Sequence, residues 1–173
     1  DLYYKKNDNS ALFESFKNVG ITNVQNFIPL YKQFFSLKES NYKNLNLNHH
    51  FHIIKVEQTN KRNKYNCIIE SGDKKENKLC FFKFSPLLDP VKFMVGKYKD
   101  MKEDEVCALP RITENTCCKK VLDSNNSAYV DSFFSYLTSK LANECGFIHG
   151  TNFYGSFLAV QTEFKLNVSE LFS

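Results

Sequence analysis

The 173-residue sequence contains no tryptophan, only six glycines and four prolines, and no apolar run that approaches the length needed to cross a bilayer. We therefore predict no membrane-spanning segment, and the opening residues Asp1–Lys6 do not have the composition of a secretory signal. The six cysteines follow no regular disulfide framework, which favours a reducing, intracellular setting. What the chain does contain is 42% hydrophobic residues and 17 phenylalanines. This composition supplies a core and excludes a disordered chain.

The charge balance does not favour a nucleic acid as partner. With 23 basic and 19 acidic residues, the formal net charge is +4. An excess this small does not produce the strong positive field of a nucleic-acid-binding protein. We therefore do not expect a nucleic acid as partner.

The first 48 residues favour a helical extension. The pattern from Ala11 to Leu37 is helical, and its second half carries apolar residues three and four positions apart (Phe27, Leu30, Tyr31, Phe34 and Phe35). Pro29 kinks this helix or moves its start. The polar segment Lys38–Asn48 is typical of a connector. The sequence thus predicts an N-terminal helical extension over residues 1–48 and an α+β domain over residues 49–173.

Three strand candidates follow in close succession and are joined by polar turns. They span Phe51–Glu57, Tyr65–Glu70 and Leu79–Phe84. Short strands with short polar connections indicate an antiparallel meander. In the third strand Lys83 shares a face with Leu79 and Phe81, because strand side chains alternate. If that strand is central, the Lys83 ammonium faces a core or a cleft and requires an anion.

Helices and further strands complete the pattern. Asp89 and Pro90 form a helix start with a capping carboxylate and a proline in the first position. The strongest helix signal is Ser127–Glu144, capped by Asn126 or Ser127 and ended by Gly146. Its apolar stripe predicts a buried face against the meander, formed by Val130, Phe133, Phe134, Leu137 and Leu141. The last two strand candidates are Asn152–Val160 and Phe164–Ser169.

Three strands, a helix and two more strands is the order of elements in the N-terminal lobe of a protein kinase, whose third strand carries a lysine. The segment Gly146–Phe157 resembles the kinase passage from the long helix into the fourth strand. The phrases Phe82–Pro90 and Asn126–Leu137 resemble kinase-like proteins of the nucleocytoplasmic large DNA viruses, or giant viruses. This resemblance covers roughly residues 31–169. It implies an α+β fold with an antiparallel sheet of about five strands and one long packing helix.

The resemblance also implies a site. Lys83 matches the lysine that pairs with a helix carboxylate and with ATP phosphates, and Asp131 is the candidate carboxylate. The turn Gln58–Lys64 has no glycine where a kinase has its glycine-rich loop, and no His-Arg-Asp or Asp-Phe-Gly phrase occurs. This chain alone is therefore not expected to transfer phosphoryl groups, and no resident cofactor is expected.

Two functions are compatible with this pattern. The favoured one is a degenerate kinase-like module that serves as a structural or protein-binding component of a large DNA virus. Its expected partners are other viral or virion proteins, and its expected location is the virion or the host cytoplasm. The alternative is the N-terminal lobe of an active serine/threonine kinase that binds ATP-Mg²⁺ and is truncated before its C-terminal lobe. A third reading is an adaptor without kinase ancestry that recruits a partner strand at a sheet edge.

Each candidate site also has a simpler interpretation. Lys83 can be a strand-end lysine whose ammonium reaches water, and the basic turn Thr59–Lys64 can be a solvated hairpin. A metal site is conceivable from irregularly spaced ligand types, namely His49, His50, His52, Cys107, Cys117, Cys118, Cys145 and His149. Cys145 with His149 has the composition of a nucleophile and its base, but the sequence marks no third group to orient them. Cys67 and Cys80 are read as small buried hydrophobes.

Overall fold

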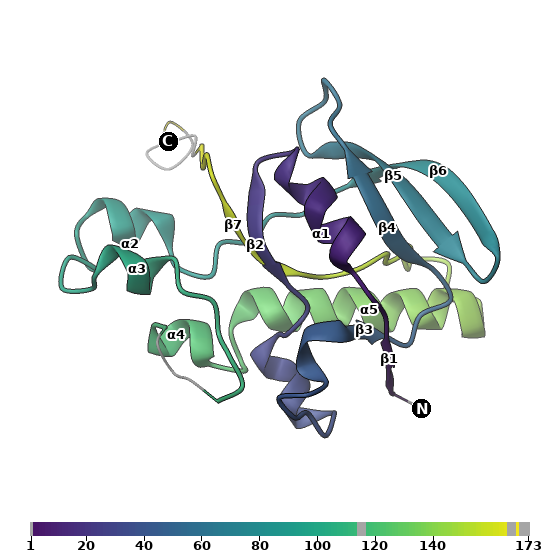
Figure 1. The fold of residues 1–173 in the computed structure, drawn as a ribbon, viewed down its shortest axis with the longest axis horizontal. Helices are drawn as coiled ribbons and strands as arrows, with labels where there is room; N and C mark the ends of the chain where they lie inside the picture. The colour runs from purple at the N-terminus through teal and green to yellow at the C-terminus, as the bar shows by residue number, and fades with distance from the viewer. Residues whose placement is uncertain (1, 114–116, 166–168, 170–173) are drawn as a thin grey trace.

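The computed structural model describes residues 2–113, 117–165 and 169, and within these the chain is an α+β fold with seven antiparallel strands in three small sheets. Figure 1 shows the long helix running beneath the sheets, with two short helices projecting to one side. The helices are α1 (Ser10–Lys17), η1 (Pro29–Gln33), η2 (Tyr42–Asn44), α2 (Pro90–Met94), α3 (Glu103–Val106), α4 (Lys119–Leu122) and α5 (Ser127–Cys145). The strands are β1 (Tyr4–Lys6), β2 (Ile21–Gln25), β3 (Leu45–Leu47), β4 (His52–Glu57), β5 (Lys64–Ser71), β6 (Lys74–Phe81) and β7 (Leu158–Gln161).

The meander is confirmed as the sheet β4-β5-β6. The third strand begins five residues before the predicted Leu79, because Gly72, at φ +58°, closes a tight turn that pairs Ser71 with Lys74. Residues Lys74–Lys78 are polar and exposed on an edge strand, so they carry no apolar alternation that would reveal the strand. The strand also ends at Phe81, before Lys83.

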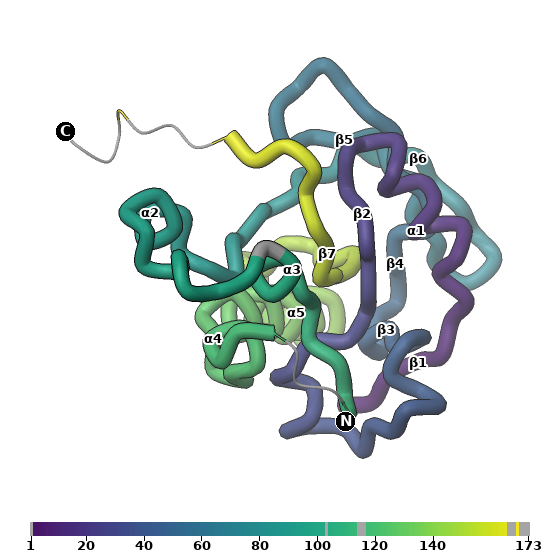
Figure 2. Tube along the Cα trace, turned by 60° about the vertical axis from the view of Figure 1, so that its left-hand side comes forward, coloured from purple at the N-terminus to yellow at the C-terminus, as the bar shows by residue number. Residues whose placement is uncertain are grey.

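The remaining strands do not join the meander in the one sheet of about five strands that the sequence predicts. β1 pairs with β3, and β2 pairs with β7 (Figure 2). Of the predicted strand Asn152–Val160, only its end forms β7. The predicted strand Phe164–Ser169 lies partly outside the described residues, and those that are described there form no strand.

The predicted helical extension over residues 1–48 is instead a mixture of short helices and strands. The helix that begins near Ala11 ends at Lys17, since Gly20 takes φ +74° and turns the chain into β2. Pro29 opens the short 3-10 helix η1, as its fixed φ allows. Because β2 pairs with β7 and α1 packs on β4, these residues share their packing with the rest of the chain.

Two hydrophobic clusters hold the fold. The first lies between α5, η1 and β3, and consists of Ile28, Leu30, Tyr31, Phe35, Leu45, Leu47, Tyr129, Phe133, Tyr136 and Leu158. The second lies between α1 and the meander, and consists of Leu12, Phe16, Ile21, Ile53, Val56, Tyr65, Cys67, Ile69 and Cys80. Cys67 and Cys80 are thus buried among hydrophobic residues, as predicted. The helix that covers the meander is α1, and not α5 as the sequence predicts.

Helix α5 has the predicted caps but a different buried face. The Asn126 side chain accepts a hydrogen bond from the Ala128 amide at 3.1 Å, and Gly146 ends the helix at φ +70°. The buried side chains are Tyr129, Phe133, Tyr136 and Ser139. Three members of the predicted apolar stripe are exposed instead: Val130, Phe134 and Leu141. Tyrosines reach the core because their hydroxyls find partners there, as Tyr129 does by donating to the Val121 carbonyl at 2.8 Å.

The chain after α5 returns closely along that helix. A Cβ atom on Gly150 would lie 2.5 Å from the Thr138 carbonyl oxygen and 2.8 Å from Cβ of Ala142. Only glycine fits here, because the obstructing oxygen belongs to the helix backbone. This contact directs the following segment to Phe153, whose amide donates to Oγ of Ser139 at 2.9 Å.

Candidate functional site

The structure brings the two predicted site residues together. Nζ of Lys83 lies 2.7 Å from Oδ2 of Asp131, which is on the second turn of α5. Both side chains are well exposed, 64% for Lys83 and 46% for Asp131. An ion pair this exposed contributes about 0–1 kcal/mol to stability. Its role as a nucleotide contact remains a prediction.

Lys83 does not face a core, which corrects the inference from a central strand. β6 is one of the two edge strands of its sheet, and its outer face carries Leu79 at 51% exposure and Phe81 at 65%. Cys80, which points to the other side, is buried. One face of this small sheet is covered by α1 while the other is open to water. Lys83 follows β6 by two residues and is itself exposed.

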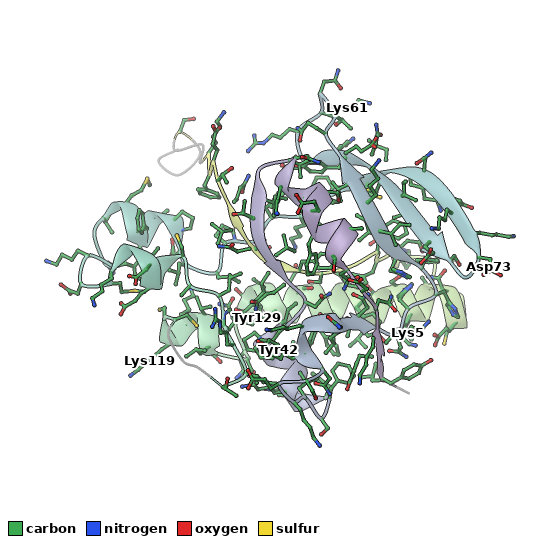
Figure 3. The ribbon with its side chains drawn as sticks, in the orientation of Figure 1. Lys5, Tyr42, Lys61, Asp73, Lys119 and Tyr129 are labelled. Carbon is green, nitrogen blue, oxygen red and sulfur yellow. The ribbon has the colours of Figure 1, made fainter. Side chains whose placement is uncertain are left out.

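The basic turn between β4 and β5 is a compact and exposed hairpin end. Oγ1 of Thr59 accepts a hydrogen bond from the Lys61 amide at 3.1 Å and donates to the Lys64 carbonyl. Lys61 extends from the tip of the turn away from the body of the molecule (Figure 3). This arrangement agrees with the solvated-turn reading.

A groove that the sequence does not predict lies between the projecting helices and β7. Figure 2 shows α2 and α3 set apart from the meander, on the side of β7. The groove encloses about 540 Å³ and is lined by Pro86, Leu87, Leu88, Pro90, Phe93, Met94, Val106, Cys107, Ala108, Leu109, Val121, Ala159, Val160 and Phe164. No lining residue carries a formal charge, and three large ones are half-exposed: Phe93, Met94 and Phe164. A volume of this size is typical of a ligand or side-chain pocket.

The start of α2 fixes one wall of the groove. Oδ1 of Asp89 accepts hydrogen bonds from the amides of Val91 at 3.0 Å and Lys92 at 3.3 Å. With Pro90 in the first helical position, this confirms the predicted helix start. The cap orients Phe93 and Met94 along one edge of the groove. The apolar face of this short helix was the one sequence signal for the site, because the other walls come from three distant segments.

A buried polar cluster joins α5 to the segment between β3 and β4. Nε2 of His49 lies 2.8 Å from Oγ of Ser139, and both residues are buried. Nδ1 of His49 faces the Phe51 amide at 3.5 Å, so the neutral ring donates from Nε2 to Ser139. Burial lowers the pKa of His49 to about 4, and the nearby His50 and Lys140 act in the same direction. The cluster is enclosed, so its role is to hold the helix in place.

The residues considered for a metal site do not gather. Among the described residues, no three histidine, cysteine, aspartate or glutamate side chains form a group that could hold a metal ion. His52 pairs with Glu70 at 3.3 Å, and His50 lies 3.9 Å from Glu144. Cys145 and His149 are exposed, and the His149 ring lies against Phe147.

No family model matches this chain, and no curated protein or solved structure is significantly similar to it. No helix in residues 2–113 and 117–165 is long and apolar enough to span a membrane.

Proposed function

We propose that this chain is a non-catalytic, kinase-like module that binds a protein partner through the apolar groove between α2, α3 and β7. The groove is the observation that carries the proposal. It encloses about 540 Å³ and presents uncharged, mostly hydrophobic side chains to solvent. Concave apolar surfaces of this kind receive the aromatic or aliphatic anchor residues of a protein partner. By the resemblance in sequence, the partner is another protein of a large DNA virus, in the virion or the viral factory.

The kinase-like ancestry rests on the sequence phrases and on two features of the fold. The three-stranded meander precedes the long helix, and the lysine after its third strand pairs with a carboxylate of that helix. The division of the strands into three sheets departs from a kinase lobe. Such a departure is compatible with a module that keeps the order of the meander and the long helix but does not catalyse phosphoryl transfer.

The groove is tested with a charged substitution at its rim. Displayed random peptides are selected on the wild-type chain, and the enriched peptides are measured by fluorescence anisotropy on the Met94→Glu variant. We expect peptides with two or more large apolar residues that bind with dissociation constants on the order of micromolar. We expect Met94→Glu to weaken their binding at least tenfold, because it leaves a carboxylate unpaired in an apolar site.

Val95 supplies the matched control for this experiment. It follows Met94, is 66% exposed and does not line the groove. Val95→Glu adds the same charge next to the site and should leave the affinity within a factor of two. Peptides that bind both variants equally well, or a selection that enriches no apolar motif, would overturn the proposed function.

The Lys83–Asp131 ion pair favours a second candidate, the N-terminal lobe of an active serine/threonine kinase. Lys83 fits the phosphate-binding half of an ATP site, since its ammonium is accessible and already lies near a helix carboxylate. The turn Gln58–Lys64 does not fit the other half. Side chains at every position of this turn keep its backbone from the close approach that glycines give.

Calorimetry with ATP-Mg²⁺ separates the two candidates. For the non-catalytic module we expect no saturable heat up to millimolar ATP, and no difference between wild type and Lys83→Met. A kinase lobe would instead bind with a measurable constant that Lys83→Met weakens at least tenfold. Lys78→Met is the control, because Lys78 is an exposed lysine of β6 that pairs with Glu76 and not with α5.

A further inference from the structure

The outer edge of β6 carries main-chain groups that no described strand pairs. β6 is last in the strand order of its sheet, and Figure 1 shows it on the far side of the molecule from α2 and α3. The other edge of this sheet is partly closed, because the Ile53 amide of β4 donates to the Tyr154 carbonyl at 2.9 Å. Residues Lys74–Leu79 of β6 are all exposed, so the outer edge is accessible to a partner.

The register determines which main-chain groups point outward. In an antiparallel pair, residues that bond to the neighbouring strand alternate with residues whose N–H and C=O groups point away from it. The Phe82 amide donates to the carbonyl of Asn63, which lies opposite it, at 2.8 Å. The same alternation continues along β6 to the residues that bond to β5, namely Cys80, Lys78, Glu76 and Lys74. The residues between them direct their N–H and C=O groups to the outer edge: Lys75, Asn77, Leu79 and Phe81.

The charge of the chain is concentrated around this edge. Residues 52–83, which contain the sheet, carry eight basic and four acidic side chains, so they hold the whole formal excess of +4. Lys74, Lys75 and Lys78 lie on β6 itself, and Lys64 lies on β5. Lys75 pairs with a glutamate of β5 and Lys78 with one of β6, whereas Lys64 and Lys74 form no ion pair with any described residue. The edge therefore presents ammonium groups that a partner can neutralise.

We propose that the outer edge of β6 binds an acidic, extended segment of a protein partner, which joins the sheet as a fourth strand. The main-chain groups of the segment would pair with the four outward residues, as in other cases of strand addition. Its carboxylates would lie across from the lysines of β6, because opposite charges stabilise a cross-strand pair. This surface is separate from the apolar groove, and the proposal does not depend on the function of that groove.

The chemistry of the edge favours a polypeptide over other occupants. The edge alternates donors with acceptors, which a polypeptide strand matches, whereas a nucleic-acid backbone offers phosphates that only accept. Leu79 and Phe81 are exposed beside these groups, and they favour apolar side chains at alternate positions of the added strand. A second copy of this chain would bring two lysine-rich edges together, and edge lysines oppose such pairing.

A designed peptide tests the proposal. Acetyl-Thr-Val-Thr-Ile-Glu-Thr-Thr-Glu-Glu-amide places valine and isoleucine opposite Phe81 and Leu79 when it runs antiparallel to β6, and its glutamates lie opposite Lys78, Lys75 and Lys74. It is titrated into the ¹⁵N-labelled wild-type chain, and amide hydrogen exchange is followed by NMR. We expect a dissociation constant on the order of 0.1 mM. At about 1 mM peptide, exchange of the four outward amides of β6 should then slow about tenfold.

Methylated peptides test the main-chain pairing without altering the protein. N-methylation of the fourth and sixth peptide residues removes donors that face β6, and should weaken binding at least tenfold. N-methylation of the third and fifth residues removes donors that face away, and should leave the affinity within a factor of three. Equal affinities for the two methylated peptides would show attraction by charge alone and would overturn strand addition.

Charge reversal tests the role of the lysines. Lys74→Glu combined with Lys78→Glu should weaken peptide binding at least tenfold. Lys97→Glu combined with Lys99→Glu makes the same change in net charge at exposed lysines that follow α2, and should leave the affinity within a factor of two.

Three results would overturn the proposal. The first is unchanged exchange of the outward amides at about 1 mM peptide. The second is slowed exchange of the same amides on addition of oligouridylate, with no effect of the peptide, which would assign the edge to a nucleic acid. The third is slowed exchange as the concentration of the protein alone is raised, which would identify a second copy as the occupant.

Discussion

Replacing Phe133 by alanine should lower the free energy of unfolding by about 3–5 kcal/mol, which is the usual cost of removing a buried aromatic side chain. Phe133 is 6% exposed and lies in the cluster between α5, η1 and β3. Its ring stacks on Phe34, with 4.6 Å between centroids, and contacts Tyr136 at 5.6 Å. Truncation removes these ring contacts and leaves a cavity in the cluster. Urea unfolding monitored by circular dichroism measures the loss.

The adjacent residue is the control. Phe134→Ala removes an identical side chain from the same helix, but Phe134 is 64% exposed. We expect this variant to remain within about 1 kcal/mol of the wild type. The measurement is made at 5 µM protein for both variants. Equal losses for the two variants would show that the stripe predicted from the sequence, and not the face described here, is buried.

Acidification from pH 7 to pH 4 should destabilise the protein by about 3 kcal/mol through His49 alone, if the unfolded chain titrates near 6.5. Burial lowers the pKa of His49 in the folded protein to about 4. Between these two values the unfolded chain binds a proton that the folded chain excludes. The contribution of His49 to stability is therefore complete above about pH 6.5 and is lost as the pH falls to about 4.

The surroundings of the His49 ring explain why the folded protein excludes this proton. A second proton on the ring would sit on Nδ1, which faces the amide hydrogen of Phe51. The added charge would also lie near Lys5 and Lys140. Burial also lowers the pKa of His52, against the opposing effect of Glu70, so His52 acts in the same direction.

Unfolding free energies at pH 7.0 and pH 4.5 test this account in two variants. His49→Gln keeps a donor toward Ser139 and removes the titrating ring, so its stability should fall less steeply with acid than that of the wild type. His50→Gln replaces a neighbouring ring that is 67% exposed, and the wild-type pH dependence should persist. An unchanged pH dependence in His49→Gln would contradict the assignment.

Local signals in the sequence predicted the local structure well. The start of α5, its two caps and the Asp89–Pro90 helix start were predicted correctly, and α5 ends one residue after the predicted Glu144. Each of these features depends on residues within one helical turn. The meander was also predicted, since alternating side chains and a glycine turn are encoded in consecutive residues.

The same local signals did not predict how distant segments of the chain pack together. The prediction of the buried face of α5 was wrong because it favoured strongly apolar residues over Tyr129 and Tyr136. The hydroxyls of these tyrosines donate hydrogen bonds to residues elsewhere in the chain. The groove was missed because its walls meet only in three dimensions. For the ion pair, a family pattern named both Lys83 and Asp131, but the exposure of the pair depends on β6 being an edge strand.

The pairing of β2 with β7 has a consequence for biosynthesis. Thr22 pairs with Val160, so a strand made early in translation has no partner until nearly 140 more residues have been added. At bacterial to eukaryotic elongation rates of about 5–20 residues per second, this delay is on the order of ten seconds. During that interval Ile21, and the side of α1 that packs beside it, stay accessible to chaperones and proteases. Because β2 and β7 pair late, the nascent chain is more accessible to proteases than the folded protein is.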